Sequence, residues 1–496
     1  TFIGSLSGMG NTTGTQNVAV GVSALDNNTT ANYNNAVGYQ ALYSNTTTQH
    51  NNAFGWKSLY TNDGGISNSG FGDRTLGLNT TGDNNTAMGY MALYSNTTAS
   101  GNTAVGYKAG FANTTGSQNT VVGSEALDNA TTAVANTSVG YGSMADTSTG
   151  SYNTAVGSQS LLLNTTGTEN VAVGYQTLDA NTTGTHNTSV GNYALGANST
   201  ASNNTAVGYS ALTSNTTGAQ NTALGRQSLT ANSTADNGTA VGYRALISNT
   251  TGAGNTAVGK DAGYYTTTGS DNTYIGLASG PNVAASTGSN NTALGRSALR
   301  SNTTASNNTA VGYQAAYTNT TGTGITALGE TALAANTTGN YNTALGRDSM
   351  TANTSGADNT AAGESALGSN TTGSYNVAMG RLSLSFNTTA AYNTAVGFKA
   401  NLNGTTGGIN TFVGALSAGN GVVTGTHNVG HGAESLYSLT SGTDNVGVGY
   451  QALSLNTSGS YNVAIGREAL EANTTASNNT AVGYRAGYSQ SGNGNG

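Results

Sequence analysis

The residues able to do acid–base or metal chemistry are few and widely spaced in this chain. It holds 4 His, 20 Asp and Glu together, and no Cys in 496 residues. His50, His186 and His427 stand in separate parts of the sequence, and only His431 lies close to another histidine. The isolated carboxylates include Glu125, Asp128, Glu169, Glu330 and Glu364. A metal centre needs several converging His, Cys or carboxylate ligands, and no Ser–His–Asp arrangement stands out. We therefore predict no catalytic residue, no metal, no cofactor and no enzymatic activity.

Composition narrows the function classes further. Charged residues make up 7%, the net charge is −7, and there are 73 Gly and 1 Pro. A nucleic-acid binder needs a basic footprint, which is missing. No apolar run reaches the roughly 18 residues of a membrane span, and no signal peptide opens the chain. Glycine is frequent, but no lysine pattern of a phosphate loop follows it. The sequence begins inside a repeat, so we expect a segment of a longer protein.

A short tandem repeat positions every one of these residues. The glycine of the phrase "AVG" recurs from Gly4 to Gly483 in 29 copies, and 26 of the 28 intervals equal the seventeen-residue step from Gly4 to Gly21. We number positions in each copy from this glycine as position 0. Such a period is too short for a pair of helices, and Asn, Thr and Gly are poor helix formers. The repeat predicts an all-β fold: one parallel β-solenoid, or β-roll, of about 29 coils over residues 1–496.

Two intervals are longer than the period and predict small irregular insertions. The first runs from Gly276 to Gly295, carries the only proline, Pro281, and has its insertion near residues 277–291. The second runs from Gly414 to Gly432, is rich in glycine, and has its insertion near residues 415–428.

Alternation within the repeat predicts two short strands per coil, around positions −4 to −1 and +2 to +5. Position −1 is apolar in nearly every copy and position +4 is Leu in 19 copies. Because side chains alternate across a strand, we expect positions −1 and +4 to face each other in a thin core. The residues predicted for this core are Val20, Val37, Val105, Leu25, Leu42 and Leu93.

Asparagine marks the corners of the predicted coil. It occupies position −4 in 26 of 28 copies and recurs at position +7 in most of them. Asn tolerates left-handed backbone, and Asn side chains stacked in register can form hydrogen-bonded ladders. The Gly or Ala that ends the phrase "NTTG" suits a turn with positive φ. The asparagines predicted to form the two ladders include Asn17, Asn34, Asn51, Asn85 and Asn102 at position −4, and Asn28, Asn45, Asn62, Asn79 and Asn96 at position +7.

The energetics of one coil favour an assembly of several chains. About two large buried side chains contribute roughly 1.5–3 kcal/mol each, whereas ordering a backbone residue costs about 1–2 kcal/mol. Further burial between chains would supply the difference. Alanines at positions −2 and +3 would let neighbouring backbones approach closely; examples are Ala19, Ala24, Ala36, Ala41, Ala87 and Ala92. At about 4.8 Å per coil the rod would be roughly 140 Å long.

Position +1 varies most and is the candidate recognition column. It holds mainly Tyr, with Arg or Glu between, and rows of aromatic and Arg side chains suit glycan or protein contacts. Packing of these rings across a groove between chains is the alternative. The candidate residues are Tyr39, Trp56, Tyr90, Tyr141, Tyr175, Tyr209, Tyr243, Arg226 and Arg347.

The phrase "NTT" also matches the acceptor motif of N-glycosylation. The alternative is a ladder of Asn and Thr side chains that satisfies the backbone of the turns. Calcium-binding solenoids need Asp at fixed turn positions, and these turns carry Asn and Thr instead.

The motifs "NTAVGYxAL" and "NVAIGREAL" (Asn462–Leu470) resemble the head repeats of trimeric autotransporter adhesins. They also resemble repeat sequences in the shafts of phage tail fibres. The resemblance implies a homotrimeric rod. We expect an extracellular or cell-surface structural and adhesive fibre, which is either the head or shaft of a trimeric adhesin or a self-assembling surface filament. Its expected partners are further copies of itself and a host-surface protein or glycan, without nucleic acid and without membrane insertion in this segment. A tail-fibre shaft on a virion, presenting a receptor-binding tip outside this segment, is the alternative.

Overall fold

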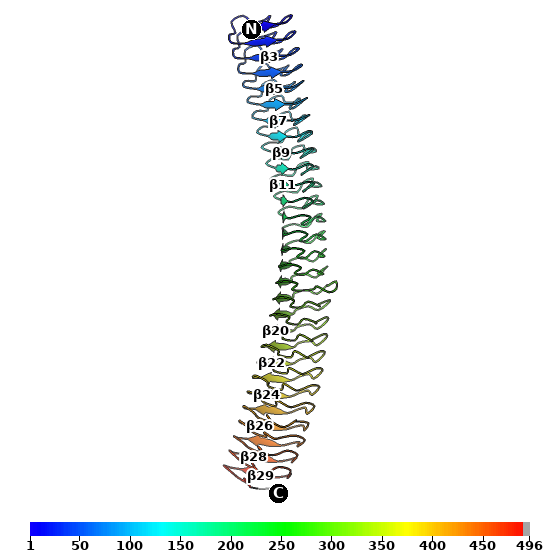
Figure 1. Ribbon diagram of the computed structural model, residues 1–496, viewed down its shortest axis with the longest axis vertical. Coiled ribbons are helices and arrows are strands. Elements are labelled where there is room, and N and C mark those ends of the chain that lie inside the picture. Colours follow the sequence, from blue (N-terminus) through cyan, green and yellow to red (C-terminus); the bar gives the residue numbers. More distant parts are fainter. Residues whose placement is uncertain (490–496) are drawn as a thin grey trace. The chain divides into compact units, whose positions relative to one another are not determined.

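The chain folds as a parallel β-solenoid with one short strand per coil, and each sequence repeat forms one coil (Figure 1). The computed structural model describes residues 1–489, and this range contains no helix. Two compact units can be distinguished, Thr1–Arg244 and Ala245–Gly496.

The strands of the first unit are β1 Phe2–Ile3, β2 Val18–Val20, β3 Asn35–Val37, β4 Asn52–Phe54, β5 Ser69–Phe71, β6 Thr86–Met88, β7 Thr103–Val105, β8 Thr120–Val122, β9 Thr137–Val139, β10 Thr154–Val156, β11 Val171–Val173, β12 Thr188–Val190, β13 Thr205–Val207, β14 Thr222–Leu224 and β15 Thr239–Val241. Those of the second are β16 Thr256–Val258, β17 Thr273–Ile275, β18 Thr292–Leu294, β19 Thr309–Val311, β20 Thr326–Leu328, β21 Thr343–Leu345, β22 Thr360–Ala362, β23 Val377–Met379, β24 Thr394–Val396, β25 Thr411–Val413, β26 Val429–His431, β27 Val446–Val448, β28 Val463–Ile465 and β29 Thr480–Val482.

Within each unit, consecutive strands pair in parallel and in register. Ala87 of β6 pairs with Ala104 of β7, its counterpart one repeat later. Each coil therefore places a residue on its own counterpart in the next coil. The residues at one repeat position therefore form a column along the solenoid. Such a column, rather than a single residue, is the functional element of this fold.

The middle residue of each strand, at position −2, points into the interior. The sequence had predicted that position −1 would do so. The alanines at positions −2 and +3 are fully buried inside the coil, so they cannot mediate contacts between chains. Leu25, Leu42 and Leu93 are fully buried, whereas Val20, Val37 and Val105 are only half-buried and point outward. The assignment of these valines to the core was wrong.

The physical reason for this inversion is the thinness of the coil. The leucine at position +4 packs against position −2 of the following coil, where only a small side chain fits. A methyl group added at Gly447, at position −2, would lie 3.4 Å from Cγ of Leu436. Valine at this position would compete for the space that the leucine fills, so the larger residues of the strand take the outer face.

The second expected strand does not form. Residues at positions +2 and +4 adopt left-handed backbone instead, as at Ser23 (φ 53°) and Leu25 (φ 52°). The N–H groups of these two residues point toward opposite neighbouring coils: Ser23 donates to the carbonyl of Ser5 at 2.9 Å and Leu25 to that of Ala41 at 2.9 Å. The segment thus bonds the coil before it and the coil after it. A left-handed Leu is uncommon, so neither propensity nor alternation could predict this turn.

The glycine at position 0 forms the corner after the strand. Gly225 has a φ of +143°, and a Cβ placed on it would lie 2.5 Å from the carbonyl oxygen of Gly242. Both the backbone angle and the close stacking of coils therefore require glycine here. The glycines that end "NTTG", such as Gly218, do not have positive φ, so that expectation was wrong. Their turn is held by the side chain of Asn215, whose Nδ2 donates to the carbonyl of Gly218 at 2.9 Å.

The asparagines at positions −4 and +7 form two buried ladders that satisfy the corners. The N–H of Asn85 donates to Oδ1 of Asn68 at 3.0 Å, and its Nδ2 donates to the carbonyl of Ala99 at 2.8 Å. Nδ2 of Asn96 donates to Oδ1 of Asn79 at 2.7 Å and to the same carbonyl of Ala99 at 3.0 Å. The two ladders meet at one carbonyl in each coil and close the turn from both sides. The ladder asparagines named above are all buried: Asn17, Asn34, Asn51, Asn85, Asn102, Asn28, Asn45, Asn62, Asn79 and Asn96.

The irregular coils keep the interior filled by exchanging large and small residues. Tyr274 replaces alanine at position −2 and is fully buried. Position +4 holds Gly263 and Gly280 on either side, and a Cβ on either glycine would lie within 2.7 Å of the Tyr274 ring. One tyrosine thus fills the space of two leucines. Its burial raises the pKa of the Tyr274 hydroxyl.

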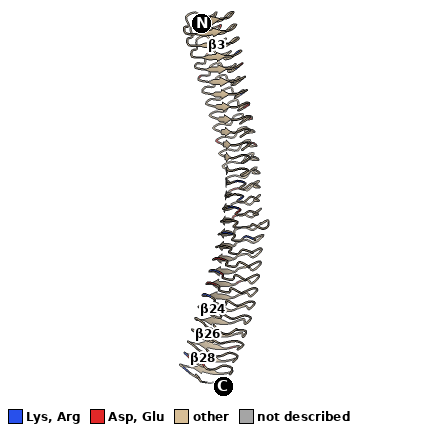
Figure 2. Ribbon diagram, viewed as in Figure 1, with Lys and Arg blue, Asp and Glu red and all other residues tan. Residues whose placement is uncertain are grey.

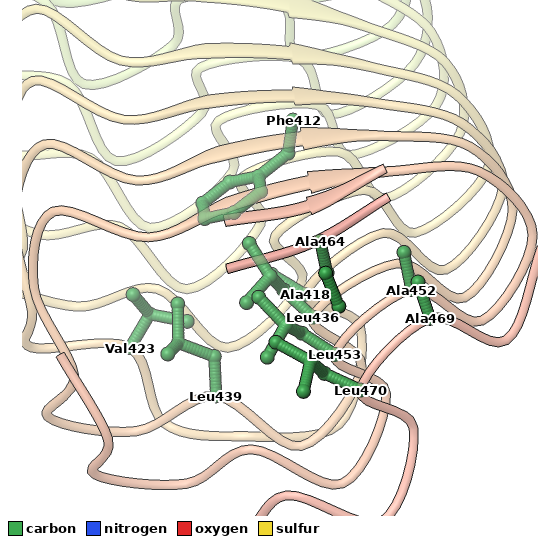
Figure 3. Close-up of a cluster of buried hydrophobic side chains, with 11 residues drawn as sticks. Phe412, Ala418, Val423, Leu436, Leu439, Ala452, Leu453, Ala464, Ala469 and Leu470 are labelled. Carbon is green, nitrogen blue, oxygen red and sulfur yellow. The ribbon is translucent and has the colours of Figure 1, made fainter. Parts of the chain in front are cut away.

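A second exchange occurs beside the other irregular interval, within residues 415–428. Phe412 takes position −2, and Val423 and Leu439 pack together where the asparagine ladder at position +7 is interrupted (Figure 3). An apolar cluster therefore replaces the position +7 ladder in this stretch, while the position −4 ladder continues through Asn410 and Asn428.

Candidate functional site

The Asn and Thr side chains of the "NTT" segment form hydrogen bonds between coils and within the turn. The hydroxyl of Thr97 donates to the carbonyl of Thr114 in the next coil at 3.0 Å. The preceding Asn96 is fully buried and uses its Nδ2 in two hydrogen bonds, to Asn79 and Ala99. A sugar attached to this nitrogen would require the ladder to open, so glycosylation at Asn96 is incompatible with the folded coil.

Stacking of coils brings acid–base residues together that are one repeat apart in the sequence. Glu169 and His186, both at position −5, lie in adjacent coils with 2.8 Å between the carboxylate and Nε2. Glu364 pairs with Arg347 and Arg381, its neighbours at position +1. These two carboxylates are therefore not isolated, because a separation of one repeat in sequence is one coil in space. Within residues 1–489 no group of three or more His, Asp or Glu is placed to hold a metal ion.

Charged side chains are sparse along the ribbon, and most of it carries neither sign (Figure 2). In the second unit, position +1 alternates Glu330, Arg347, Glu364 and Arg381. Hydrogen bonding to Glu364 raises the pKa of Arg347. Glu364 therefore offsets charge of Arg347 and Arg381 within the chain.

The aromatic residues of position +1 are on the surface, as a recognition column requires. Arg226 lies between two of them, with Cζ 5.7 Å from the ring centre of Tyr209 and 5.9 Å from that of Tyr243. Such cation–π contacts order the side chains without hiding them. The residues of this column exposed over about a third of their surface or more include Tyr39, Trp56, Tyr90, Tyr141, Tyr175 and Tyr209.

The outer face of the strands forms a second continuous surface. Position −1 places an apolar side chain on this face in every strand except β26, which carries His431 there. Examples are Val139, Val156, Val173, Val190 and Val207 in β9 to β13. Thr or Val at position −3 lies beside each of them. The result is a narrow apolar strip along each unit. Sequence reasoning missed it because it placed these side chains inside.

Around the corner from this strip, a hollow of about 260 Å³ opens in the first unit. It combines the only Trp of the chain with two cationic side chains and two tyrosines. Its lining residues are Trp56, Lys57, Tyr60, Thr61, Arg74, Gly77, Leu78 and Tyr94. Of these, only Trp56 was singled out from the sequence. The others become visible when the coils are written under one another in register.

A second hollow, of about 320 Å³, lies in the second unit. Its main polar contact is closed within the chain, because Nη1 of Arg300 donates to the hydroxyl of Tyr317 at 2.7 Å. The remaining lining residues are Leu277, Ala278, Arg296, Ser297 and Gln314.

Comparison with models of known protein families gave no match, and comparison with curated proteins gave none either. Over residues 1–489 there is no helix long and apolar enough to cross a membrane.

Proposed function

We propose that the chain is a segment of an extracellular structural and adhesive fibre, in which three copies lie side by side along their strand faces. The observation that carries the proposal is the apolar strip at position −1, repeated coil after coil on the outer face of the strands. The resemblance to trimeric adhesin heads supports the number of chains and the location. Stiffness and repetitive display, rather than a reaction, would be the work of such a fibre.

The size of the strip is consistent with a stable contact. A three-residue strand is about 10 Å long and coils stack at about 4.8 Å, so each coil offers roughly 50 Å². Fifteen strands in the first unit then give on the order of 700 Å², and the second unit gives a similar area. A standard interface buries about 800 Å² per partner. The two units together therefore exceed this value.

A second copy of the chain is the partner that fits the strip best. The apolar side chains recur once per coil, and a surface of different spacing would fall out of step within a few coils. A parallel copy keeps the same spacing throughout, and rotational symmetry among identical chains closes the assembly.

Sedimentation of the isolated chain tests the assembly. We expect three times the mass of one chain at micromolar concentration. The triple variant Val156→Lys, Val173→Lys, Val190→Lys places three charges on the strip and should sediment as a monomer with an unchanged circular dichroism spectrum.

The matched control carries the same three charges on another outward face. It is Thr166→Lys, Thr183→Lys, Thr200→Lys, at exposed positions of the turns, and it should remain trimeric. A monomeric wild-type chain at tens of micromolar would overturn the proposal. A trimeric Val variant would overturn the assignment of the strip as the contact.

A further inference from the structure

The hollow in the first unit arises from a single interruption in a column of aromatic rings at position +5. Tyr43 and Tyr60 stack in adjacent coils with ring centres 5.3 Å apart. Tyr94 and Phe111 stack in the same way at 5.6 Å. Gly77 stands between the two pairs, where the next ring of the column would be. The column thus lacks one ring, and the hollow lies at that place.

Gly77 does not have positive φ, so its backbone does not require glycine. A Cβ at Gly77 would meet the edge of the Tyr94 ring at 2.8 Å, which shows that this ring leans over the gap. The hollow is therefore bounded by aromatic surface and has a floor without a side chain. A six-membered ring is about the size of the aromatic ring that the column lacks.

Two cationic side chains lie over this aromatic surface. Nζ of Lys57 is 5.1 Å from the Trp56 ring centre and 5.0 Å from that of Tyr60. Cζ of Arg74 is 4.5 Å from the Trp56 ring centre. Within residues 1–489 neither cation has an ion pair with a carboxylate, and Asp73 accepts the backbone N–H of Trp56 at 3.1 Å. The two positive charges are therefore available to an anionic ligand.

We propose that this hollow binds an acidic sugar, a uronic acid residue of a polysaccharide. The pyranose ring would pack with its apolar face in the hollow beside Gly77, against Tyr60 and Tyr94. Its carboxylate would pair with Arg74, which offers a planar fork of donors, and with Lys57. The volume is near the lower end for ligand sites, about 300 Å³, and suits one sugar unit of a longer chain that continues into solvent.

This inference deepens the proposed function, because an adhesive fibre needs a surface ligand, and it rests on that proposal for its biological meaning. The binding itself does not depend on assembly. One such site per chain would bind the single sugar weakly, with a Kd on the order of 1 mM. Three chains displaying the site to one polymer would raise the apparent affinity by roughly 10²-fold or more.

Fluorescence of Trp56 provides a direct measurement, since it is the only Trp. We expect a saturable change when the full chain is titrated with oligoglucuronate, and at least tenfold weaker binding with the matched neutral oligoglucose. No change at 10 mM oligoglucuronate would overturn the proposal, and so would equal binding of the neutral sugar. An equal response to sodium sulfate alone would identify an anion site without sugar recognition and would also overturn it.

Variants place the site. Gly77→Phe moves the Tyr94 ring aside and places a ring in the hollow, and Arg74→Gln removes the charged group that would pair with the sugar carboxylate. Each should weaken binding at least tenfold. The matched control is Lys108→Gln. Lys108 lies over the rings of Tyr107 and Phe111 as Lys57 lies over those of Trp56 and Tyr60, but it does not line the hollow. Unchanged binding by Gly77→Phe would overturn the location.

The same titration on the monomeric Val156→Lys, Val173→Lys, Val190→Lys variant separates the two proposals. Binding by this variant together with a monomeric wild-type chain would leave the sugar site standing and the fibre proposal overturned. A trimeric wild-type chain that binds no sugar would overturn the sugar site and leave the fibre proposal standing.

Discussion

At the scale of single residues, the glycine at position 0 combines two demands that no other residue meets. We predict that Gly225→Ala lowers the free energy of unfolding by roughly 3 kcal/mol or more, of which backbone strain at its left-handed φ contributes about 1–3 kcal/mol. That φ is +143°, and the added Cβ would lie 2.5 Å from the carbonyl oxygen of Gly242. Urea unfolding followed by circular dichroism measures the change.

Gly196 provides the matched control for this substitution. It lacks positive φ, and its Cβ would be 3.4 Å from the nearest atom, Oδ1 of Asp179. Gly196→Ala should therefore stay within about 0.5 kcal/mol of wild type. Equal losses for the two variants would show that stacking between coils is not what selects glycine.

Glu468 makes stability depend on pH. Its carboxylate lies 2.5 Å from Nε of Arg485 and 2.8 Å from Nε of Arg467, and these hydrogen bonds lower the pKa of Glu468. A carboxyl whose pKa is lower in the folded chain stabilises it above the unfolded pKa, about 4.3. This contribution is lost as the pH falls through the folded pKa.

We predict that Glu468→Gln has a smaller loss of stability than wild type when the pH is lowered from 5 to 3. The measurement is the urea midpoint across this range. Glu471→Gln, which removes a carboxylate without an ion pair in the described residues, should follow the wild-type profile. A parallel profile for Glu468→Gln would contradict the assignment.

At the scale of elements, the sequence predicts the repeat and its corners better than the direction of its side chains. The period and the Asn columns are visible because stacking in register preserves them. The outward direction of Val105 was not predictable from hydrophobicity, because it depends on the room that a buried leucine leaves inside a thin coil. The turn at Leu25 depends on hydrogen bonds to two neighbouring coils, which no local pattern reports.

The candidate site follows the same distinction. Trp56 stands out in the sequence as a change of residue type within its column. The hollow beside it depends on Gly77 and Arg74, which belong to the next coil. Only the stacking of coils makes these residues neighbours. A glycine where an aromatic residue is missing, such as Gly77, does not stand out in a sequence rich in glycine.

The exchange of large and small residues between adjacent coils can be tested at Tyr274. Tyr274→Ala should cost roughly 3–5 kcal/mol because it leaves a cavity. Adding Gly263→Leu and Gly280→Leu, which restores the pattern of regular coils, should recover most of this loss. Differential scanning calorimetry of the three variants measures the coupling.

The double variant Gly263→Leu, Gly280→Leu, which keeps Tyr274, is the counterpart in this cycle. It should destabilise the chain, because a Cβ at either glycine would lie within 2.7 Å of the Tyr274 ring. Additive effects would show that Tyr274 does not occupy the leucine space.

At the scale of the whole molecule, each coil contacts mainly its sequence neighbours, so the fold is modular. We predict that deletion of residues 192–208, one complete repeat, leaves a folded solenoid with an unchanged circular dichroism spectrum per residue. The deletion joins Gly191 to Tyr209 and returns every column to its register.

Deletion of residues 192–200, which is about half a repeat, is the control. It places outward residues in the interior over the junction, and the thermal midpoint should fall sharply. Equal tolerance of both deletions would contradict the modular description.

The irregular coils around Tyr274 and Phe412 have a consequence for how the chain finds its fold. A strand shifted by one whole repeat meets almost the same partners, so regular coils offer many nearly degenerate pairings during folding. A buried tyrosine that fits only beside Gly263 and Gly280 makes such a shift costly at one place. These irregular coils would then fix the register of strand pairing in a chain whose other repeats are nearly interchangeable.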